Sequence, residues 1–182
     1  MNSRRAGNTT RRVKNDESSL KNPVYSAKSN NSVRSRLMKE LSEIMLSSNK
    51  SVTAFPDEEN TFKWHGKIKG PPDSIYQGLA YKMSLNFPEN YPYEAPTIKF
   101  VTPCFHPNVD AQGNICLDVL KEMWSSCNSV LSVLVSIQSL LQDPNIESPL
   151  NPQAATLWKT PIEYKRALIS ASSDAIEVFN SW

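Results

Sequence analysis

The chain has 182 residues, of which 39% are hydrophobic and 21% charged, and its net charge is +2. This composition is ordinary for a soluble globular protein and argues against a disordered, collagen-like or membrane-embedded chain. The most apolar stretch, at 130–141, is interrupted by serines and is shorter than the ~20 residues that span a bilayer. Because the N-terminus also lacks a secretory signal, we expect a protein of the cytoplasm and nucleus, with no membrane partner.

The first 30 residues differ from the rest of the chain. They hold seven basic side chains and two acidic ones, a net charge of +5, and few large apolar residues. This pattern is typical of a solvated, disordered extension. A basic arm can also bind nucleic acid or an acidic protein groove, but nothing else in the sequence supports nucleic acid. We therefore predict a disordered extension at 1–30 and one domain at 31–182.

The domain is predicted to begin with a helix, followed by four strands. Asn31 or Ser32 can cap a helix whose apolar side chains recur every three or four positions, with charged residues on its outward face. The apolar positions are Val33, Leu37, Leu41, Ile44 and Met45, and the outward ones are Arg34, Arg36, Lys39 and Glu40. Apolar and polar residues then alternate at 52–55, 61–68, 79–87 and 97–101, which predicts an antiparallel meander.

A loop rich in proline and three more helices complete the pattern. The loop at 87–96 contains Tyr93 between two prolines, either as core lining or as a contact for a partner protein. Asn128 or Ser129 caps the next helix, which ends before Asp143-Pro144. On the side opposite its apolar residues, serines and Val135 form a smooth face, which is either solvated or a binding surface for another protein. Helices at 152–158 and 161–179 each open with proline. The order of elements predicts an α+β fold.

Three cysteines, Cys104, Cys116 and Cys127, are too few for a disulfide scaffold, so we expect reduced thiols. With His106 they offer zinc-ligand chemistry, but their spacing matches no zinc motif, and we expect no metal. A thiol protease would need an imidazole base against its nucleophile. The available histidines are His65, on the polar side of a strand, and His106, before a proline in a turn, where a structural hydrogen bond is favoured. The five glycines form no nucleotide-binding motif.

The stretch HPNVDAQGNICLD, residues 106–118, contains a cysteine with no strong base beside it, so its thiol would need a reaction that proceeds without such a base. A substrate that arrives as a thioester meets this requirement, because one thiolate simply replaces another. The acyl group can next pass to an amine, a step that builds an oxyanion. A carboxamide is a suitable donor to that oxyanion, and Asn108 lies eight residues before Cys116.

Several motifs, in order, resemble those of ubiquitin-conjugating enzymes. They are His106-Pro107-Asn108, Cys116-Leu117-Asp118 with Trp124, KWHGKIKGPPDSIYQG (63–78), NFPENYPYEAPTIKFVTP (86–103) and DPNIESPLN (143–151). The resemblance runs from about Val33 to the last helix. It implies an N-terminal helix, a four-stranded meander, a long central helix and two C-terminal helices. It also implies that an activating enzyme loads ubiquitin on Cys116 as a thioester and that a RING-type ligase directs it to lysines of protein substrates. We expect no cofactor on this chain.

The resemblance further implies roles for individual residues. Asn108 would stabilise the oxyanion or order a loop, with His106, Pro107 and Asp118 as structural support. The ligase would contact the chain at Arg36, Tyr93, Ser125 and Ser126. Donor ubiquitin would lie on Val135 and Ser139, and a second ubiquitin on the reverse face of the sheet at Thr53. Many family members carry an aspartate where this chain has Ser148, beside Glu147, so Ser148 or Glu147 would assist the incoming lysine.

Within the family, the basic extension together with NICLDVLKEMWSS, SIQSLL and PNIESPLN resembles the cyclin-selective group. That group works with the anaphase-promoting complex in cell-cycle protein degradation during mitosis. Two alternatives stay open on the sequence alone: an enzyme for another ligase or another ubiquitin-like modifier, and a non-catalytic ubiquitin-binding module on the same scaffold. The presence of Cys116 argues against the second alternative.

Overall fold

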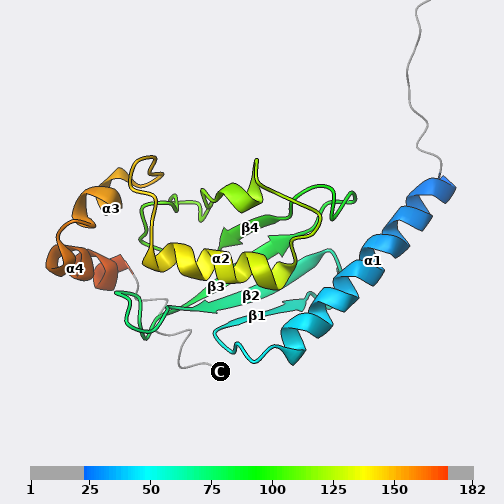
Figure 1. The fold of residues 1–182 in the computed structure, drawn as a ribbon, viewed down its shortest axis with the longest axis horizontal. Helices are drawn as coiled ribbons and strands as arrows, with labels where there is room; N and C mark the ends of the chain where they lie inside the picture. Colours follow the sequence, from blue (N-terminus) through cyan, green and yellow to red (C-terminus); the bar gives the residue numbers. More distant parts are fainter. Residues whose placement is uncertain (1–22, 172–182) are drawn as a thin grey trace, which may run out of the picture.

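The structure is a computed structural model that describes residues 23–171 (Figure 1). Four helices, one short 3-10 helix and four strands make up this part of the chain. They are α1 (Pro23–Leu46), β1 (Val52–Pro56), β2 (Lys63–Lys69), β3 (Ala80–Asn86), β4 (Thr97–Phe100), η1 (Asp118–Leu120), α2 (Val130–Gln142), α3 (Pro152–Leu157) and α4 (Pro161–Ala171). The sheet is antiparallel with the order β1-β2-β3-β4. The predicted α+β meander is therefore confirmed.

Helix α1 begins at Pro23, eight residues before the cap predicted at Asn31. Proline is favoured in the first turn of a helix because its missing N–H has no intrahelical partner there. Asparagine and serine inside a helix each cost less than about 1 kcal/mol, so the cap signal at 31–32 does not stop the helix. The predicted boundary between extension and domain lies inside α1. Residues 1–22 of that extension, and residues 172–179 of the predicted last helix, lie outside the described residues.

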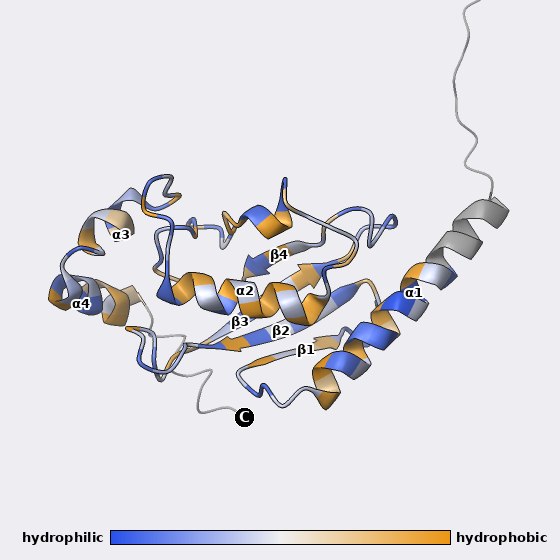
Figure 2. Cartoon of the chain, viewed as in Figure 1, coloured by the Kyte–Doolittle hydropathy of each residue, from blue (hydrophilic) through white to orange (hydrophobic). Residues whose placement is uncertain are grey.

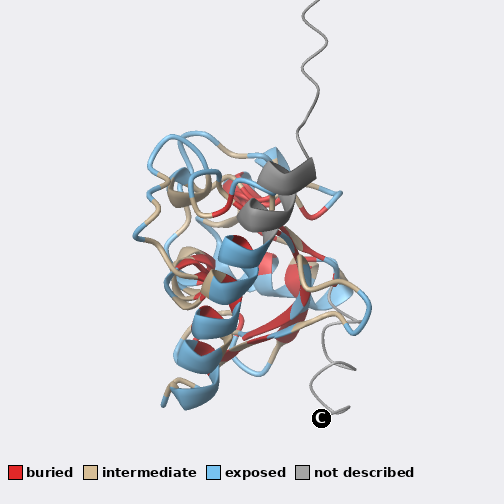
Figure 3. Ribbon diagram, turned by 90° about the vertical axis from the view of Figure 1, so that its right-hand side faces the viewer, coloured by how far each residue is buried: buried red, intermediate tan, exposed pale blue. Residues whose placement is uncertain are grey.

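Helix α2 crosses one face of the sheet, as Figure 1 shows, and it is strongly hydrophobic along this crossing (Figure 2). Ser129 caps it, as predicted: the Ser129 side chain accepts a hydrogen bond from the N–H of Ser132, and the Ser132 side chain accepts one from the N–H of Ser129. The buried side of the helix joins one cluster with the alternating residues of the strands. The fully buried members of this core include Trp64, Ile68, Tyr81, Leu85, Leu134 and Ile137. Figure 3 shows the buried segments between α1, α2 and the sheet.

The opposite face of the sheet is the polar side of the predicted alternation. Thr53, Lys67 and Lys82 are neighbours across β1, β2 and β3. Although Lys67 lies on this polar side, only 7% of it is exposed, and burial lowers the pKa of its amine. Among the helices that the structure describes, none is long and apolar enough to cross a bilayer.

Candidate active site

Cys116 lies at the end of a short loop that folds back on itself after β4. Val109 and Ile115 form an isolated antiparallel bridge, and the N–H of Cys116 donates to the carbonyl of Asn108 at 2.9 Å. The thiol is half-buried, whereas Cys104 is buried and Cys127 is exposed. The loop thus holds the backbone of Cys116 rigidly while one side of the residue remains open to solvent.

Asn108 is only 1% exposed, and its carboxamide joins the Cys116 loop to the loop after α2. Its Nδ2 donates to the carbonyl of Asn145 at 2.7 Å, and its Oδ1 accepts from the N–H of the same residue at 2.8 Å. The side chain of Asn145 in turn accepts from the N–H of Glu147 at 3.0 Å. Glu147 and Ser148 are exposed on this loop. The two hydrogen bonds between Asn108 and Asn145 therefore fix the position of the loop that carries Glu147 and Ser148 relative to Cys116.

Pro107 adds a second attachment between the same two loops. Its carbonyl accepts from the N–H of Leu150 at 2.8 Å and from the N–H of Asn151 at 2.9 Å. Asn151 also caps α3, because its side chain accepts from the N–H of Ala154. The stretch from Pro107 to Asn108 therefore anchors the whole connection between α2 and α3.

His106 has a buried position with both ring nitrogens engaged. Nδ1 accepts from the N–H of Asn108 at 3.0 Å, which places the proton of the neutral ring on Nε2, and Nε2 donates to the carbonyl of Leu140 at 2.9 Å. Burial lowers the pKa of His106 to about 4. The ring is therefore neutral at physiological pH and is oriented toward the backbone of the loop and of α2.

The geometry does not support a thiol protease. His65 is exposed on β2, as predicted, and its Nε2 lies 3.0 Å from the carboxylate of Asp57. Within residues 23–171, neither histidine hydrogen-bonds Cys116, so the general base that such a protease needs is missing. The three cysteines and His106 do not come together as a zinc site either, since the described residues contain no group of three or more side chains that could hold a metal ion.

Lys121 lies beside the thiol, which the sequence did not indicate. Its Nζ is 3.3 Å from Sγ of Cys116. The short helix η1, which begins at the exposed residue Asp118, brings this about: the N–H of Lys121 donates to the carbonyl of Asp118 at 2.9 Å and so closes the turn. The contact arises from the turn and not from any motif that could be recognised along the chain.

The sequence model of the ubiquitin-conjugating enzyme family matches residues 36–171. The chain belongs to this family. A known relative, the "Ubiquitin-conjugating enzyme E2-20 kDa" of Schizosaccharomyces pombe, is 52% identical over 149 residues, which cover 81% of this chain and 85% of that protein. The chain is accordingly a ubiquitin-conjugating enzyme, a class that works with ubiquitin, an activating enzyme and a ligase.

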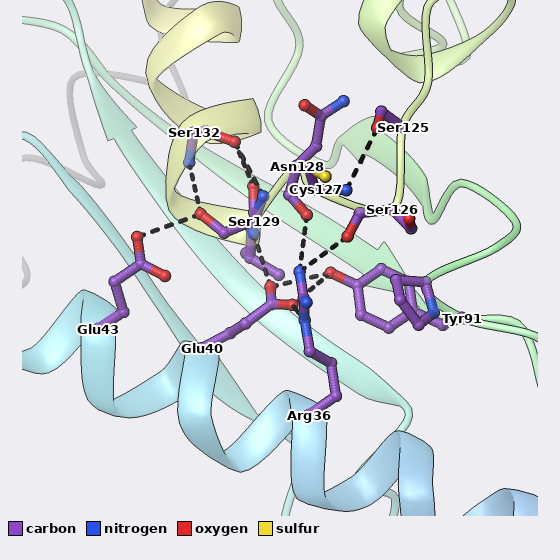
Figure 4. A network of polar contacts seen from close by, with 12 residues as sticks. Arg36, Glu40, Glu43, Tyr91, Ser125, Ser126, Cys127, Asn128, Ser129 and Ser132 are labelled. Atoms are coloured by element: carbon purple, nitrogen blue, oxygen red, sulfur yellow. Dashed lines mark hydrogen bonds and ion pairs between the residues drawn. The ribbon is translucent and has the colours of Figure 1, made fainter.

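Three of the four predicted ligase contacts of this ubiquitin-conjugating enzyme, Arg36, Ser125 and Ser126, lie in a network of polar contacts with one buried carboxylate (Figure 4). Glu40 was expected on the outward face of α1, but it is only 3% exposed. Its carboxylate accepts a hydrogen bond from Nε of Arg36. The hydroxyl of Tyr91 lies 2.8 Å from both carboxylate oxygens and shares its hydrogen between them, and the N–H of Val130 donates to one of the oxygens at 2.7 Å. The carboxylate thereby ties together α1, the loop before β4 and the start of α2.

The guanidinium of Arg36 makes hydrogen bonds within the molecule. Its Nη2 donates to the carbonyl of Ser126 at 3.2 Å and to that of Asn128 at 3.1 Å, so it shapes the loop that carries Ser125 and Ser126. The hydrogen bond to Glu40 raises the pKa of Arg36 above its usual value. Tyr93, in contrast, is 86% exposed. Of its two predicted roles, core lining is therefore wrong, and the side chain is free for a partner.

The remaining predicted surfaces lie on α2 and on the sheet. Ser139 is exposed and Val135 half-buried, and the hydroxyl of Ser139 donates back to the carbonyl of Val135 at 3.1 Å. Ser136 bonds to the carbonyl of Ser132 in the same way at 3.0 Å. Because these hydroxyls are already bonded, the helix presents a smooth surface of low polarity. Thr53 lies half-buried on β1, on the face of the sheet away from α2.

Proposed function

We propose that Cys116 accepts ubiquitin as a thioester from the activating enzyme and passes it, with a RING-type ligase, to lysines of protein substrates. The observation that carries this proposal is the half-exposed thiol of Cys116, fixed by its own backbone and lacking a histidine base. Such a thiol suits a substrate that is already activated, because thioester exchange replaces one thiolate by another. Ubiquitin then leaves Cys116 when a lysine amine attacks the carbonyl carbon and the sulfur departs.

Asn108 supports the second step by ordering the loop that the lysine must approach. One Nδ2 hydrogen is bonded to Asn145, so the amide keeps a second N–H that can serve the oxyanion. Glu147 can orient or deprotonate the incoming amine, and Ser148 can hydrogen-bond it, although a serine cannot hold the charge of an aspartate. Substitution of Asn108 by Ala should therefore slow transfer to lysine more than it slows charging of Cys116.

The ligase-binding surface that we propose consists of Tyr93, Ser125 and Ser126, with Arg36 holding the backbone of the loop. Exposed Tyr93 supplies an amphipathic anchor, a common element of protein interfaces. Donor ubiquitin would occupy the smooth surface at Val135 and Ser139. A second ubiquitin would bind at Thr53 on the reverse face of the sheet.

We further propose that the ligase is the anaphase-promoting complex, that the substrates are cell-cycle proteins degraded in mitosis, and that the enzyme works in the cytoplasm and nucleus. The support is the resemblance of NICLDVLKEMWSS, SIQSLL and PNIESPLN, together with the basic extension, to the cyclin-selective group. Deletion of residues 1–22 should leave charging of Cys116 intact and change transfer that depends on this ligase, because the segment adds charge ahead of α1. A truncated enzyme that fails to charge would contradict the role given to the extension.

The central experiment incubates the enzyme with activating enzyme, ATP, magnesium and ubiquitin, and in parallel with other ubiquitin-like modifiers. We expect an adduct with ubiquitin that thiol reagents cleave, that is lost in Cys116→Ala and that persists in the matched variant Cys127→Ala. An adduct retained in Cys116→Ala would refute the assignment of Cys116. Preferential charging with another modifier would refute the assignment of ubiquitin.

A further inference from the structure

Two tyrosines converge on the carbonyl group that precedes the His106-Pro107-Asn108 turn. Tyr76, in the loop between β2 and β3, places its hydroxyl 2.8 Å from the carbonyl oxygen of Phe105. Tyr164, on α4, places its hydroxyl 2.9 Å from the same oxygen, and the two hydroxyl oxygens lie 2.6 Å apart. Within residues 23–171, no main-chain N–H donates to this carbonyl. The two hydroxyls are thus the groups that hold it.

The two hydroxyls form one hydrogen bond to the carbonyl and one between themselves. Each has a single hydrogen to donate, and a contact of 2.6 Å between two hydroxyl oxygens requires a hydrogen between them. Both tyrosines are fully buried, and burial raises the pKa of both hydroxyls, so they remain protonated donors at physiological pH. If either hydroxyl is removed, the other can still donate to Phe105.

A short series of contacts leads from this carbonyl to the side chain of Asn108. The carbonyl of Phe105 belongs to the same planar peptide as the N–H of His106, so holding its oxygen sets the plane of that peptide. The ring of His106 accepts from the N–H of Asn108 and donates to the carbonyl of Leu140. The carboxamide of Asn108 then exchanges two hydrogen bonds with Asn145. The orientation of the Phe105 peptide is thereby passed on to the carboxamide.

We propose that Tyr76 and Tyr164 are positioning residues, which act through the turn to hold the carboxamide of Asn108 where the transfer of ubiquitin to lysine needs it. The inference rests on the role proposed for Asn108 in that transfer. The two hydroxyls bond to each other and to Phe105, so they act on the reaction through Asn108 and not by touching the thioester. Helix α4 and the loop between β2 and β3 thus contribute to the active site.

Charging of Cys116 should depend less on the two tyrosines than transfer does. The loop of Cys116 has further attachments: Val109 and Ile115 form a bridge, and the carboxylate of Asp110 accepts from the N–H and the side-chain amide of Asn114. A displaced carboxamide acts instead on transfer, where a misplacement of about 1 Å can cost about a hundredfold in rate.

The test is single-turnover transfer of ubiquitin from the charged full-length enzyme to free lysine, without a ligase and well below the melting temperature of every variant. Tyr76→Phe and Tyr164→Phe should each transfer at close to the wild-type rate, because one donor to Phe105 remains. The double variant should charge normally and transfer at least about tenfold more slowly. The control for lost stability is Ile68→Val, which removes a buried methyl group from β2 and should transfer like the wild type.

The same variants in an Asn108→Ala background separate positioning from a general structural effect. If the tyrosines act through Asn108, the double variant should slow transfer by less than about twofold once Asn108 is gone, because coupled residues are not additive. Equal slowing in both backgrounds, or a double variant that transfers at the wild-type rate, would overturn the inference. If Asn108→Ala itself transfers like the wild type, the role proposed for Asn108 is wrong and the inference falls with it. If the wild type does not charge at all, the function proposed for Cys116 is wrong.

A second measurement covers a double variant that does not fold. At least one of the two single variants removes the hydroxyl that donates to Phe105. In ¹⁵N NMR spectra of the folded enzyme, the side-chain amide signals of Asn108 should therefore shift in at least one of them and stay in place in Ile68→Val. Signals of Asn108 that are unchanged in both single variants would overturn the inference.

Discussion

Substitution of Glu40 by Gln tests the network that connects α1 with the loop of Ser125 and Ser126, part of the proposed ligase-binding surface. The carboxylate only accepts hydrogen bonds, and its two oxygens receive them from Arg36, Tyr91 and the N–H of Val130. Glutamine keeps the shape but turns one oxygen into an NH₂ group, which must then face another donor. It also leaves Arg36 without its counter-charge.

The magnitude follows from burial. Breaking a buried ion pair by removing one partner costs about 3–5 kcal/mol, and the lower end applies because the Arg36 side chain is 33% exposed. A loss of about 3 kcal/mol lowers the melting temperature of a domain of this size by about 6–12 °C. Thermal unfolding followed by circular dichroism measures this shift.

The matched control is Glu43→Gln, one turn further along α1. Glu43 is exposed and its carboxylate accepts one hydrogen bond, at 3.2 Å from Ser129, so its loss should change stability by less than about 0.5 kcal/mol. If Glu40→Gln is as stable as this control, the network does not hold α1 to the loop. A double-mutant cycle with Arg36→Met should give a coupling energy above about 0.5 kcal/mol between Arg36 and Glu40.

Three further predictions concern single side chains. First, burial lowers the pKa of His106 to about 4, so near pH 6.5 the unfolded chain takes up a proton that the folded chain does not. The free energy of unfolding should therefore fall by up to about 3 kcal/mol as the pH falls from 6.5 to 4. Urea unfolding at a series of pH values measures this loss, and a slope unchanged in His106→Gln would contradict it. Second, Cys104 is buried and burial raises the pKa of its thiol, so native enzyme should react with iodoacetamide at Cys116 and Cys127 but not at Cys104; labelling of all three at similar rates would argue against the packing. Third, Tyr93→Ala should leave the melting temperature within about 1 °C of wild type, because the side chain is 86% exposed, and should reduce ligase-stimulated transfer; unchanged stimulation would remove Tyr93 from the ligase surface.

The sheet and α2 could be predicted from the sequence because their signals are local. Alternation places Met83 and Leu85 in the core, and the side chain of Ser129 caps the helix that follows it. The start of α1 was missed because the Asn31 cap signal is weaker than the tendency of an established helix to continue from Pro23.

Parts of the site depend on how distant segments meet, and the sequence says less about those. Asn108 and Cys116 were found through their motif, but the bond from Asn108 to Asn145 joins residues that are 37 positions apart. Glu40 was assigned to solvent because it is charged, although it falls at the helical spacing of Val33, Leu37 and Ile44 and so on the buried stripe. Lys121 had no signal, since only the turn of η1 brings it back to Cys116.

The most direct test asks which sulfur holds ubiquitin in the charged wild-type enzyme. The charged enzyme is first unfolded and its free thiols, including that of Cys104, are blocked with iodoacetamide. The thioester is then cleaved with hydroxylamine, and the newly released thiol is labelled with an isotopically distinct reagent before peptide mass spectrometry. We predict the second label on Cys116 and the first on Cys127. The second label on Cys127, with Cys116 already blocked, would contradict the account.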